Sequence, residues 1–418
     1  MSSELGYPLM YEVEQTLVSR PIKDIPGGVR AQLATWDGWE SLPRGARVAV
    51  TAGSRGIQNI VLILQTVCQV LSERGFSPFI VPAMGSHGGG TVEGQLAVLS
   101  SLGITPEAVG APIRGSAELD EVGRSGDGHP VVIDRLANQA DGLIVVGRIK
   151  KHTDFSSAVE SGLMKMIAIG LGKHPQAAHI HSFGTHGLRT LIPEYAGLVL
   201  ERSPVLFGLA ILEDGYHQTS DIVLIPRQAI PTEEPKLLRQ AVGQMARLPV
   251  NEIDVLVVDW MGKDISGTGM DTNVIGRYAV EGEPDPSEPN VRYLVVLDLT
   301  EASHGNAVGV GLADLTTERL FRKIDQPAFY LNVSTSGFLE RGKIPLVCQT
   351  DRMAVGLALQ LLAPKTSDQA RLVRIKNTHD LSCFWASSAV ADELRGRRGV
   401  TVSRSGKPLG FSAQGLLE

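Results

Sequence analysis

Cysteines and clusters of basic residues are scarce in this sequence. Its three cysteines, Cys68, Cys348 and Cys383, lie far apart and form no C-x-x-C pair, which excludes a disulfide scaffold and a zinc site built from thiolates. So few cysteines are typical of the reducing cytoplasm, where we expect the protein to act. The net charge is −6, and no run of Lys and Arg occurs, so we expect neither nucleic acid nor an anionic membrane as a partner.

Long hydrophobic runs are also missing. The longest apolar stretches, such as 59–71 and 205–212, are too short to cross a bilayer. The first fifteen residues contain no basic segment followed by an apolar one, so a secretory signal peptide is not expected. The composition, 43% hydrophobic and 20% charged, is that of a globular protein. The length of 418 residues is enough for two domains.

Strands and helices alternate along both halves of the chain. Residues 47–82 predict a strand, a helix and a second strand, and residues 92–103 predict a helix with Thr91 as its N-cap. Residues 111–133 are rich in turns, and residues 141–149 and 204–214 predict further strands. Because these strands are apolar almost throughout, both faces of the sheet should be covered. The pattern predicts an α/β fold with mixed or parallel sheets.

An amphipathic segment at 233–252 is the candidate domain boundary. New apolar strands follow at 252–264, 291–300 and 371–378, and helices are predicted at 348–362 and 387–399. We therefore expect an N-terminal domain at 1–240 and a C-terminal domain at 241–418. A cleft between two such domains would be the natural ligand site.

The segment VAVTAGSRGI, residues 48–57, resembles the opening of the short-chain dehydrogenases. In those enzymes a glycine-rich turn after the first strand binds the pyrophosphate of a dinucleotide. They also need a Tyr followed four residues later by a Lys, and none of the seven tyrosines has a Lys there. A plain tight turn at Gly56 is the alternative interpretation.

Residues 87–90, His-Gly-Gly-Gly, resemble the oxyanion-hole motif of esterases. The G-x-S-x-G segment that would carry the nucleophile is absent from the sequence. The glycines are then a flexible or anion-binding loop, with Ser86 and Gly88 as candidate cofactor contacts. In that case His87 only leads into the following helix.

Four histidines follow within a short stretch, and imidazole is the commonest metal-binding side chain. They are His174, His179, His181 and His186. The H-E-x-x-H pattern of zinc proteases is absent. A conventional divalent-metal hydrolase or lyase stays open as an alternative, although the sequence names no base for it.

One set of residues, each near the end of a predicted strand or in the helical region that follows, is more specific. Arg55, His87, His152, Lys165 and His181 resemble, in order and spacing, the functional set of the nickel-pincer lactate racemase family. These enzymes racemise or epimerise 2-hydroxy acids. The resemblance covers residues 45–190 approximately and implies two α/β domains.

The resemblance implies a role for each of these residues. Arg55 would bind the substrate carboxylate, and His87 and His152 would be the two catalytic acid/base groups. Lys165 would anchor the cofactor, and His181 would bind nickel, with His179 as the second candidate. The cofactor would be a nickel-pincer nucleotide, derived from nicotinic acid adenine dinucleotide and made by accessory proteins.

The residue types also suit the chemistry that the resemblance implies. Removing the C2 hydrogen of a 2-hydroxy acid as hydride requires a base at the hydroxyl group, and both enantiomers require two such bases. Histidine can accept and return a proton near neutral pH. Lys165 stands between Met164 and Met166 in an apolar segment, where a free ammonium group is costly.

The sequence departs from the lactate-specific branch of this family at several positions. Ala52 stands where that branch tends to have Asp, and Gly269 and Thr272 stand where it has Gln and Lys. The loop at 262–277 offers other polar groups to a longer acid such as a sugar acid, namely Lys263, Asp264, Asp271 and Arg277. We expect Lys263, Asp264 and Asp271 to bind substrate. A non-catalytic member that only binds cofactor or metal is the remaining alternative.

Overall fold

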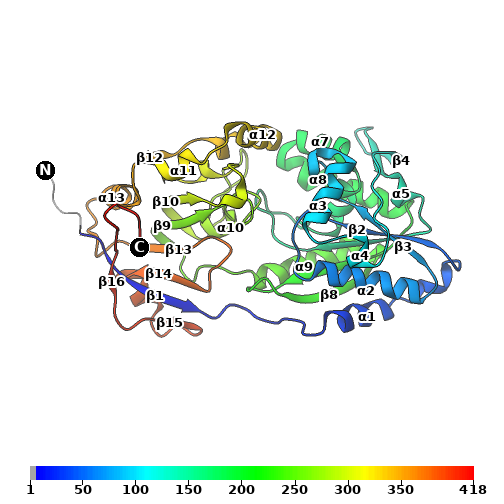
Figure 1. Cartoon of the computed structure of the whole chain (residues 1–418), viewed down its shortest axis with the longest axis horizontal. Helices are drawn as coiled ribbons and strands as arrows, with labels where there is room; N and C mark the ends of the chain where they lie inside the picture. The colour runs from blue at the N-terminus through cyan, green and yellow to red at the C-terminus, as the bar shows by residue number, and fades with distance from the viewer. Residues whose placement is uncertain (1–5) are drawn as a thin grey trace. The chain divides into compact units, whose positions relative to one another are not determined.

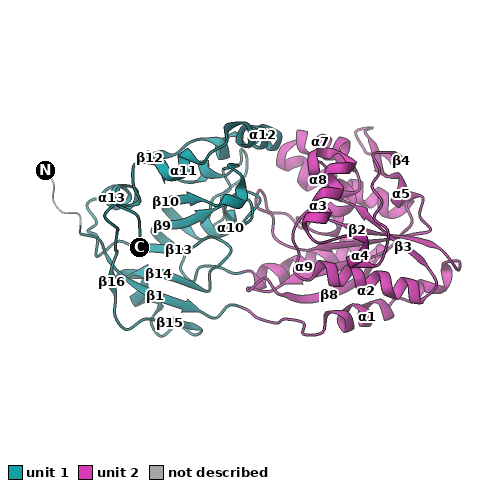
Figure 2. Cartoon of the chain, viewed as in Figure 1, with its two compact units in different colours: residues 1–17, 246–418 teal, residues 18–245 magenta. Residues whose placement is uncertain are grey.

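A computed structural model describes residues 6–418 and divides the chain into two compact units (Figures 1 and 2). One unit spans residues 18–245, and the other combines the residues up to 17 with residues 246–418. The expected boundary at 240 lies close to this division, but the N-terminus differs from expectation. Strand β1 (Leu9–Gln15) pairs with strands β14 and β15 near the C-terminus, so its hydrogen bonds tie it to the C-terminal half.

A mostly parallel sheet forms the centre of the unit at 18–245. Its strand order is β3-β2-β6-β7-β8, and only β8 runs antiparallel to its neighbour. The bounds are β2 Arg47–Ala52, β3 Ser77–Pro82, β6 Gly142–Arg148, β7 Val205–Glu213 and β8 Thr219–Pro226. A separate hairpin consists of β4 (Leu119–Arg124) and β5 (Pro130–Asp134).

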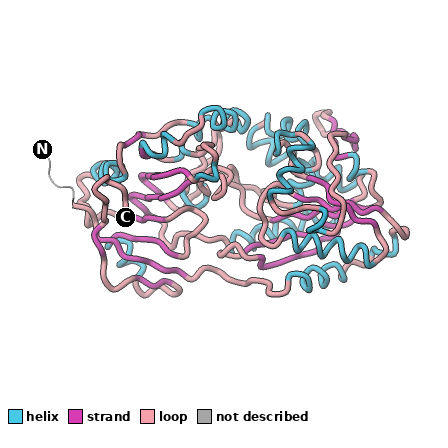
Figure 3. The backbone as a smooth tube through the Cα atoms, in the orientation of Figure 1, coloured by secondary structure: helices cyan, strands magenta, loops and turns pink. Residues whose placement is uncertain are grey.

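Helices cover both faces of this sheet, as the apolar strands predict (Figure 3). Val48 and Val50 of β2 pack with α1, α2 and α3, whereas Ala49, between them, packs with α8 and α9. The bounds are α1 Ile25–Ala34, α2 Ile60–Glu73, α3 Val92–Ser101, α4 Pro106–Val109, α5 Arg135–Asn138, α8 Gly184–Arg202 and α9 Ile230–Gln244. Thr91 caps α3 through a 3.1 Å hydrogen bond from the Gly94 amide, which confirms that prediction.

The segment between β6 and α8 is an irregular helical region. Helix formation begins with α6 (Leu163–Lys165), continues as a π-helical turn at Met166–Gly170 and resumes as α7 (Lys173–Ser182). A π-helical turn is rare and frequently marks a functional site. Gly170 ends this turn, and a Cβ atom there would lie 2.8 Å from the carbonyl oxygen of Ala83. The turn is therefore packed tightly against the loop that follows β3.

The second unit is built on a mixed sheet. Its strand order is β12-β11-β10-β9-β13-β14-β1-β15, parallel from β12 to β13 and antiparallel beyond, with β16 paired to β1. The strand bounds are β9 Glu252–Met261, β10 Asn290–Leu299, β11 Leu315–Thr317, β12 Leu346–Cys348, β13 Leu372–Ile375, β14 Cys383–Ser387, β15 Val400–Val402 and β16 Lys407–Pro408. The helices are α10 Thr272–Ile275, α11 Glu318–Arg322, α12 Gln326–Ser336, α13 Asp351–Gln360 and α14 Ser388–Leu394.

Both units confirm the predicted α/β class with mixed or parallel sheets. Among residues 6–418, none of the helices is long and apolar enough to span a membrane.

The close packing of Gly170 can be tested by substitution. Gly170→Ala should lower the free energy of unfolding by about 1–3 kcal/mol, because the new methyl group overlaps the Ala83 carbonyl. Gly197→Ala is the matched control, since a Cβ there meets nothing within 4 Å in the middle of α8. That change should stabilise the protein by about 0.5–1 kcal/mol. Urea unfolding measures both, and equal midpoints for the two variants would contradict the tight packing.

Candidate functional site

The candidate residues of the unit at 18–245 lie at one edge of its sheet. Arg55 follows β2, His87 follows β3 and His152 follows β6. Because these strands are parallel, their carboxyl ends meet at the same edge. From β2 the chain crosses to β3 on one side, and it later reaches β6 and β7 on the other. In open α/β sheets, ligands bind outside the carboxyl ends where the direction of the crossovers changes.

The segment that carries Lys165 packs against this edge. A Cβ atom at Gly147, near the end of β6, would lie 3.0 Å from Cγ of Met166. One at Gly53, just after β2, would lie 3.4 Å from Cε of the same residue. Two positions without side chains therefore let Met166 approach the ends of both strands. This contact brings Lys165 to the loops of Arg55 and His152.

His152 and Lys165 form a direct hydrogen bond. Nζ of Lys165 lies 2.6 Å from Nε2 of His152. The other ring nitrogen, Nδ1, accepts the backbone N–H of Asp154 at 3.1 Å. A neutral imidazole with an acceptor at Nδ1 carries its proton on Nε2. Nε2–H then donates to Lys165, which requires the lone pair of a neutral amine. The geometry therefore favours Lys165 as a free base.

The electrostatic surroundings shift Lys165 toward the neutral form. The pKa of Lys165 is lowered from 10.5 to about 8, mainly by burial and also by the positive charges of Arg55 and Lys150. Asp154 and Glu160 act in the opposite direction. At pH 7 about a tenth of the amine is then unprotonated, far more than for an ordinary lysine, and this is the form that reacts with electrophiles.

Arg55 lies on an exposed loop within range of the same charges. Desolvation by surrounding protein and the positive charge of Arg148 lower the pKa of Arg55, whereas Asp154 raises it. Its guanidinium group still carries a full positive charge. Arg148 is itself paired with Glu213, whose carboxylate also accepts the Gln58 amide at 2.9 Å. That contact fixes the end of the Arg55 loop, so Arg55 presents a positioned cation to solvent.

His181 lies on α7 with an exposed side chain. Surrounding protein and the positive charge of Lys165 lower its pKa to about 4, and Asp154 partly opposes this. The imidazole is therefore neutral near pH 7, the form that binds metals. His179 has a different environment, because its ring stacks on His129 at 3.3 Å between centroids. It faces the β4–β5 hairpin, so His181 is the better candidate ligand.

The His87 loop is shaped by glycines. Gly85, Gly88, Gly89 and Gly90 all have positive φ angles. A Cβ at Gly88 would lie 2.5 Å from the carbonyl carbon of Gly94, so this glycine is needed for packing against α3. The Gly85 amide donates to the Gly170 carbonyl at 3.2 Å. This bond connects the loop of Ser86 and His87 to the end of the segment that carries Lys165.

Sequence analysis missed the buried charged residues of this unit, among them Glu160, Lys173 and Glu234. Glu160 accepts the backbone amides of His152 and Ser157 at 2.6 and 3.0 Å. Lys173 pairs with buried Asp134 at 3.0 Å and also donates to the Pro82 carbonyl at the end of β3. Glu234 accepts the Met164 amide at 2.9 Å. Lys173 and Glu234 bind partners far away in sequence, so no local pattern identifies them.

The remaining candidates belong to the other unit. Asp271 caps α10 by accepting the Asn273 amide at 2.9 Å, which gives it a structural role. The ammonium group of Lys263 donates to the Gly267 carbonyl and to Asn332 at 2.6 and 2.8 Å. Asp264 is exposed and accepts the Thr300 hydroxyl. Gly269 has a φ of +75°, and a Cβ there would lie 2.6 Å from the Val308 carbonyl oxygen. A glutamine would be strained at that position.

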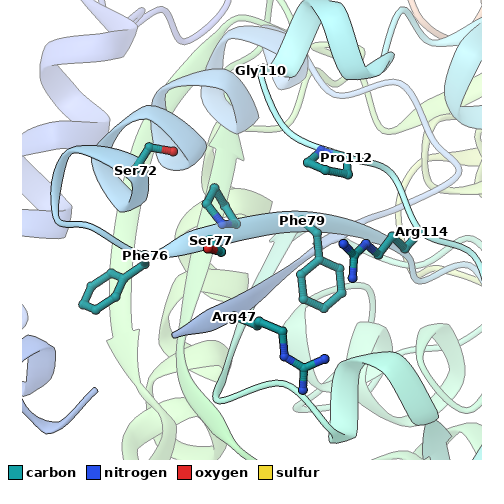
Figure 4. A pocket seen from close by; sticks show the side chains of 9 residues that line it. Arg47, Ser72, Phe76, Ser77, Phe79, Gly110, Pro112 and Arg114 are labelled. Atoms are coloured by element: carbon teal, nitrogen blue, oxygen red, sulfur yellow. The ribbon is translucent and has the colours of Figure 1, made fainter. Parts of the chain in front are cut away.

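A pocket of about 340 Å³ lies at the opposite edge of the first sheet (Figure 4). Its lining includes Arg47 and Ser77, the first residues of β2 and β3, together with Phe79 and Arg114. Strand direction therefore separates this pocket from the candidate site.

The reactivity of Lys165 tests its depressed pKa. Acylation followed by peptide mass mapping should show a rate for Lys165 that levels off above about pH 8. N-acetyl-lysine in the same tube, with an ordinary pKa of about 10.4, should keep accelerating beyond pH 10. Arg55→Gln should raise the midpoint for Lys165, and Asp154→Asn should lower it, because each removes one charge. Acylation rates of Lys165 and N-acetyl-lysine that depend on pH in the same way would contradict the lowered pKa of Lys165.

The sequence and fold of the chain are similar to those of known proteins. The model of the lactate racemase N-terminal domain matches residues 46–189, which include Arg55, His87, His152, Lys165 and His181. The lactate racemase apoprotein from Thermoanaerobacterium thermosaccharolyticum is 13% identical, with a TM-score of 0.55 over 88% of this chain and 94% of that chain. A Thermotoga maritima protein is 15% identical, with a TM-score of 0.48 over 68% and 72% of the two chains.

No curated protein matches the sequence significantly. The family model and the fold shared with the lactate racemase apoprotein confirm the resemblance inferred from the sequence. Residues 46–189 therefore match the N-terminal domain of the lactate racemases.

Proposed function

We propose that the chain is a racemase or epimerase of a 2-hydroxy acid that works with a nickel-pincer nucleotide. The observation that supports this most strongly is the hydrogen-bonded pair of His152 and Lys165, within electrostatic range of Arg55 and His181. All four belong to the segment that matches the family. Arg55 is a cation suited to a carboxylate, and His152 is suited to act as a base. Lys165 offers an amine as an anchor, and His181 a neutral imidazole as a metal ligand.

The residues present fit such a cofactor. A neutral, exposed imidazole at His181 suits one bond to nickel, and an amine with a pKa of about 8 at Lys165 suits a covalent or electrostatic anchor. Across residues 6–418, no three His, Cys, Asp or Glu side chains are arranged to hold a metal ion. This favours a metal that brings further ligands on an organic cofactor over the hydrolase alternative. Accessory proteins would supply that cofactor.

Protein side chains would orient the substrate and move its hydroxyl proton. When bound, the nickel-pincer nucleotide would supply a carbon that takes up and returns the C2 hydrogen as hydride. Arg55 would hold the substrate carboxylate through its planar guanidinium group. His152 and His87 would take the hydroxyl proton from one enantiomer each and return it to the other. Both must reach the same oxygen from different sides.

The contact between His152 and Lys165 has a consequence for this chemistry. In the structure, Nε2 of His152 is occupied by the amine of Lys165. When Lys165 instead anchors the cofactor, Nε2 would lose this partner, and in the tautomer protonated on Nδ1, which lies 3.6 Å from the Asp154 carboxylate, it could accept the substrate hydroxyl proton. Anchoring the cofactor and freeing the base would thus be one event. For the substrate, Lys263 and Asp264 remain proposed contacts that favour a longer hydroxy acid over lactate.

Nickel content tests the cofactor. Protein made in a host that synthesises the pincer nucleotide should contain close to one nickel per chain by elemental analysis. His181→Ala should lose most of it, because a metal ligand is removed, whereas His179→Ala should keep it. Absence of nickel from the wild type, in a host shown to load a known lactate racemase, would contradict the proposal. Activity with zinc or manganese alone would then favour a hydrolase or lyase.

Exchange of the C2 configuration tests the acid/base pair. His87→Ala and His152→Ala should each lower kcat for interconversion by about 10²–10⁴-fold, the usual contribution of a general acid or base. Both variants should retain nickel. Chiral chromatography of a panel of 2-hydroxy acids measures this. Full nickel in the wild type without interconversion of any acid would favour a non-catalytic binding protein.

A further inference from the structure

The helical segment that carries Lys165 begins without a cap of its own. Gly162 occupies the N-cap position of α6 and makes no side-chain bond to the helix. Glu234 on α9, seventy residues further along the chain, caps the helix instead. Its carboxylate accepts the Met164 amide at 2.9 Å. The first amides of a helix need such partners when they are buried, and Met164 is buried.

Gly162 is fitted to this carboxylate. A Cβ atom at Gly162 would lie 2.3 Å from Oε1 of Glu234 and 2.7 Å from Cδ. The carboxylate occupies the space that a side chain at the N-cap would need. Glu234 and Gly162 therefore form one unit, in which the glutamate replaces the missing capping side chain.

Lys165 follows Met164 directly, so the capped turn sets the position of its amine opposite His152. At the other end of the pair, Glu160 binds the backbone amide of His152 at 2.6 Å. We propose that Glu234 is a positioning residue, which caps the turn at 163–165 and thereby holds Lys165 within hydrogen-bond distance of His152. This inference rests on the proposed function, because that function gives the pair its importance.

Burying the ionised carboxylate of Glu234 costs free energy, which a purely structural cap would not require. The side chain is 1% exposed, and its Oε1 atom has no hydrogen-bond partner among the described residues. Burial raises the pKa of Glu234 to about 7 from an ordinary value of 4.5. The folded protein then holds a proton that the unfolded chain has lost, so stability falls as pH rises from 4.5 to 7. A neutral glutamine would avoid this loss.

A double-mutant cycle tests the fit between the two residues in the protein without cofactor. Gly162→Ala should lower the Tm by several degrees in the wild type, because the new Cβ meets the carboxylate. The same change in a Glu234→Ala background should have less than a third of that effect. An equal loss in both backgrounds would overturn the fitted cap. Glu234→Gln should raise the Tm at pH 8 relative to the wild type.

Amide exchange and NMR test the capping and the positioning separately. In Glu234→Ala, hydrogen exchange at Leu163 and Met164 should accelerate at least tenfold, and the Nε2 resonance of His152 should shift. Leu238→Ala is the matched control, because it removes a buried side chain from the same helix α9 and keeps the Glu234 carboxylate. Identical exchange and identical His152 spectra in the two variants would overturn the proposal.

Kinetics of the loaded enzyme complete the test. Glu234→Ala should lower kcat at least tenfold with KM within twofold, whereas Glu234→Gln, which keeps an acceptor oxygen at the same reach, should stay within threefold of the wild-type kcat. Leu238→Ala should change neither constant by more than twofold. A kcat for Glu234→Ala that equals that of Leu238→Ala would contradict a positioning role. If the wild type neither binds nickel nor turns over, the proposed function fails, while exchange and NMR still decide the cap.

Discussion

Close packing at the carboxyl ends of β2 and β6 positions the segment that carries Lys165. Gly53 after β2 and Gly147 near the end of β6 leave room for Met166 at the point where the crossovers change direction. Met166 in turn brings Lys165 to the loops that carry Arg55 and His152. Any larger residue at Gly147 would displace the helical segment and separate the amine from its partner. The absence of a side chain at Gly147 is therefore what allows the Lys165 segment to pack against the sheet.

The second constraint is electrostatic. Several cations share this sheet edge with fewer anions, and surrounding protein makes each positive charge costly. The amine of Lys165 responds by giving up its proton readily, and His181 responds by staying neutral. The surroundings therefore favour the unprotonated form of both residues more than water does. Perturbed pKa values of this kind cluster at functional sites.

Support for the pair of His152 and Lys165 comes from carboxylates that bind backbone. Glu160 binds the His152 amide, and Glu234 binds the Met164 amide beside Lys165. Because backbone amides fix the path of the chain, these contacts hold the backbone from which the side chains of His152 and Lys165 extend. The irregular π-helical turn that follows Lys165 then joins the segment to the His87 loop through Gly170. Short hydrogen bonds thus connect loops that follow different strands.

Much of the unit at 18–245 could be read from local sequence. Apolar runs predicted β2, β3, β6 and β7, because a strand buried on both faces is apolar along most of its length. Thr91 predicted the start of α3. The order of Arg55, His87, His152, Lys165 and His181 likewise predicted the family. Local patterns failed for β1, whose seven residues pair with strands formed nearly four hundred residues later.

The sequence by itself determined the fold class, the family and the residue types of the candidate site. Tertiary structure alone decided that Lys165 bonds to His152, that His179 turns to the hairpin instead of joining His181, and that Asp271 caps a helix. It also revealed Glu234 and its fit to Gly162. The physical reason is that periodicity and spacing record only neighbours along the chain. Hydrogen bonds, desolvation and close packing act between segments that meet only after folding.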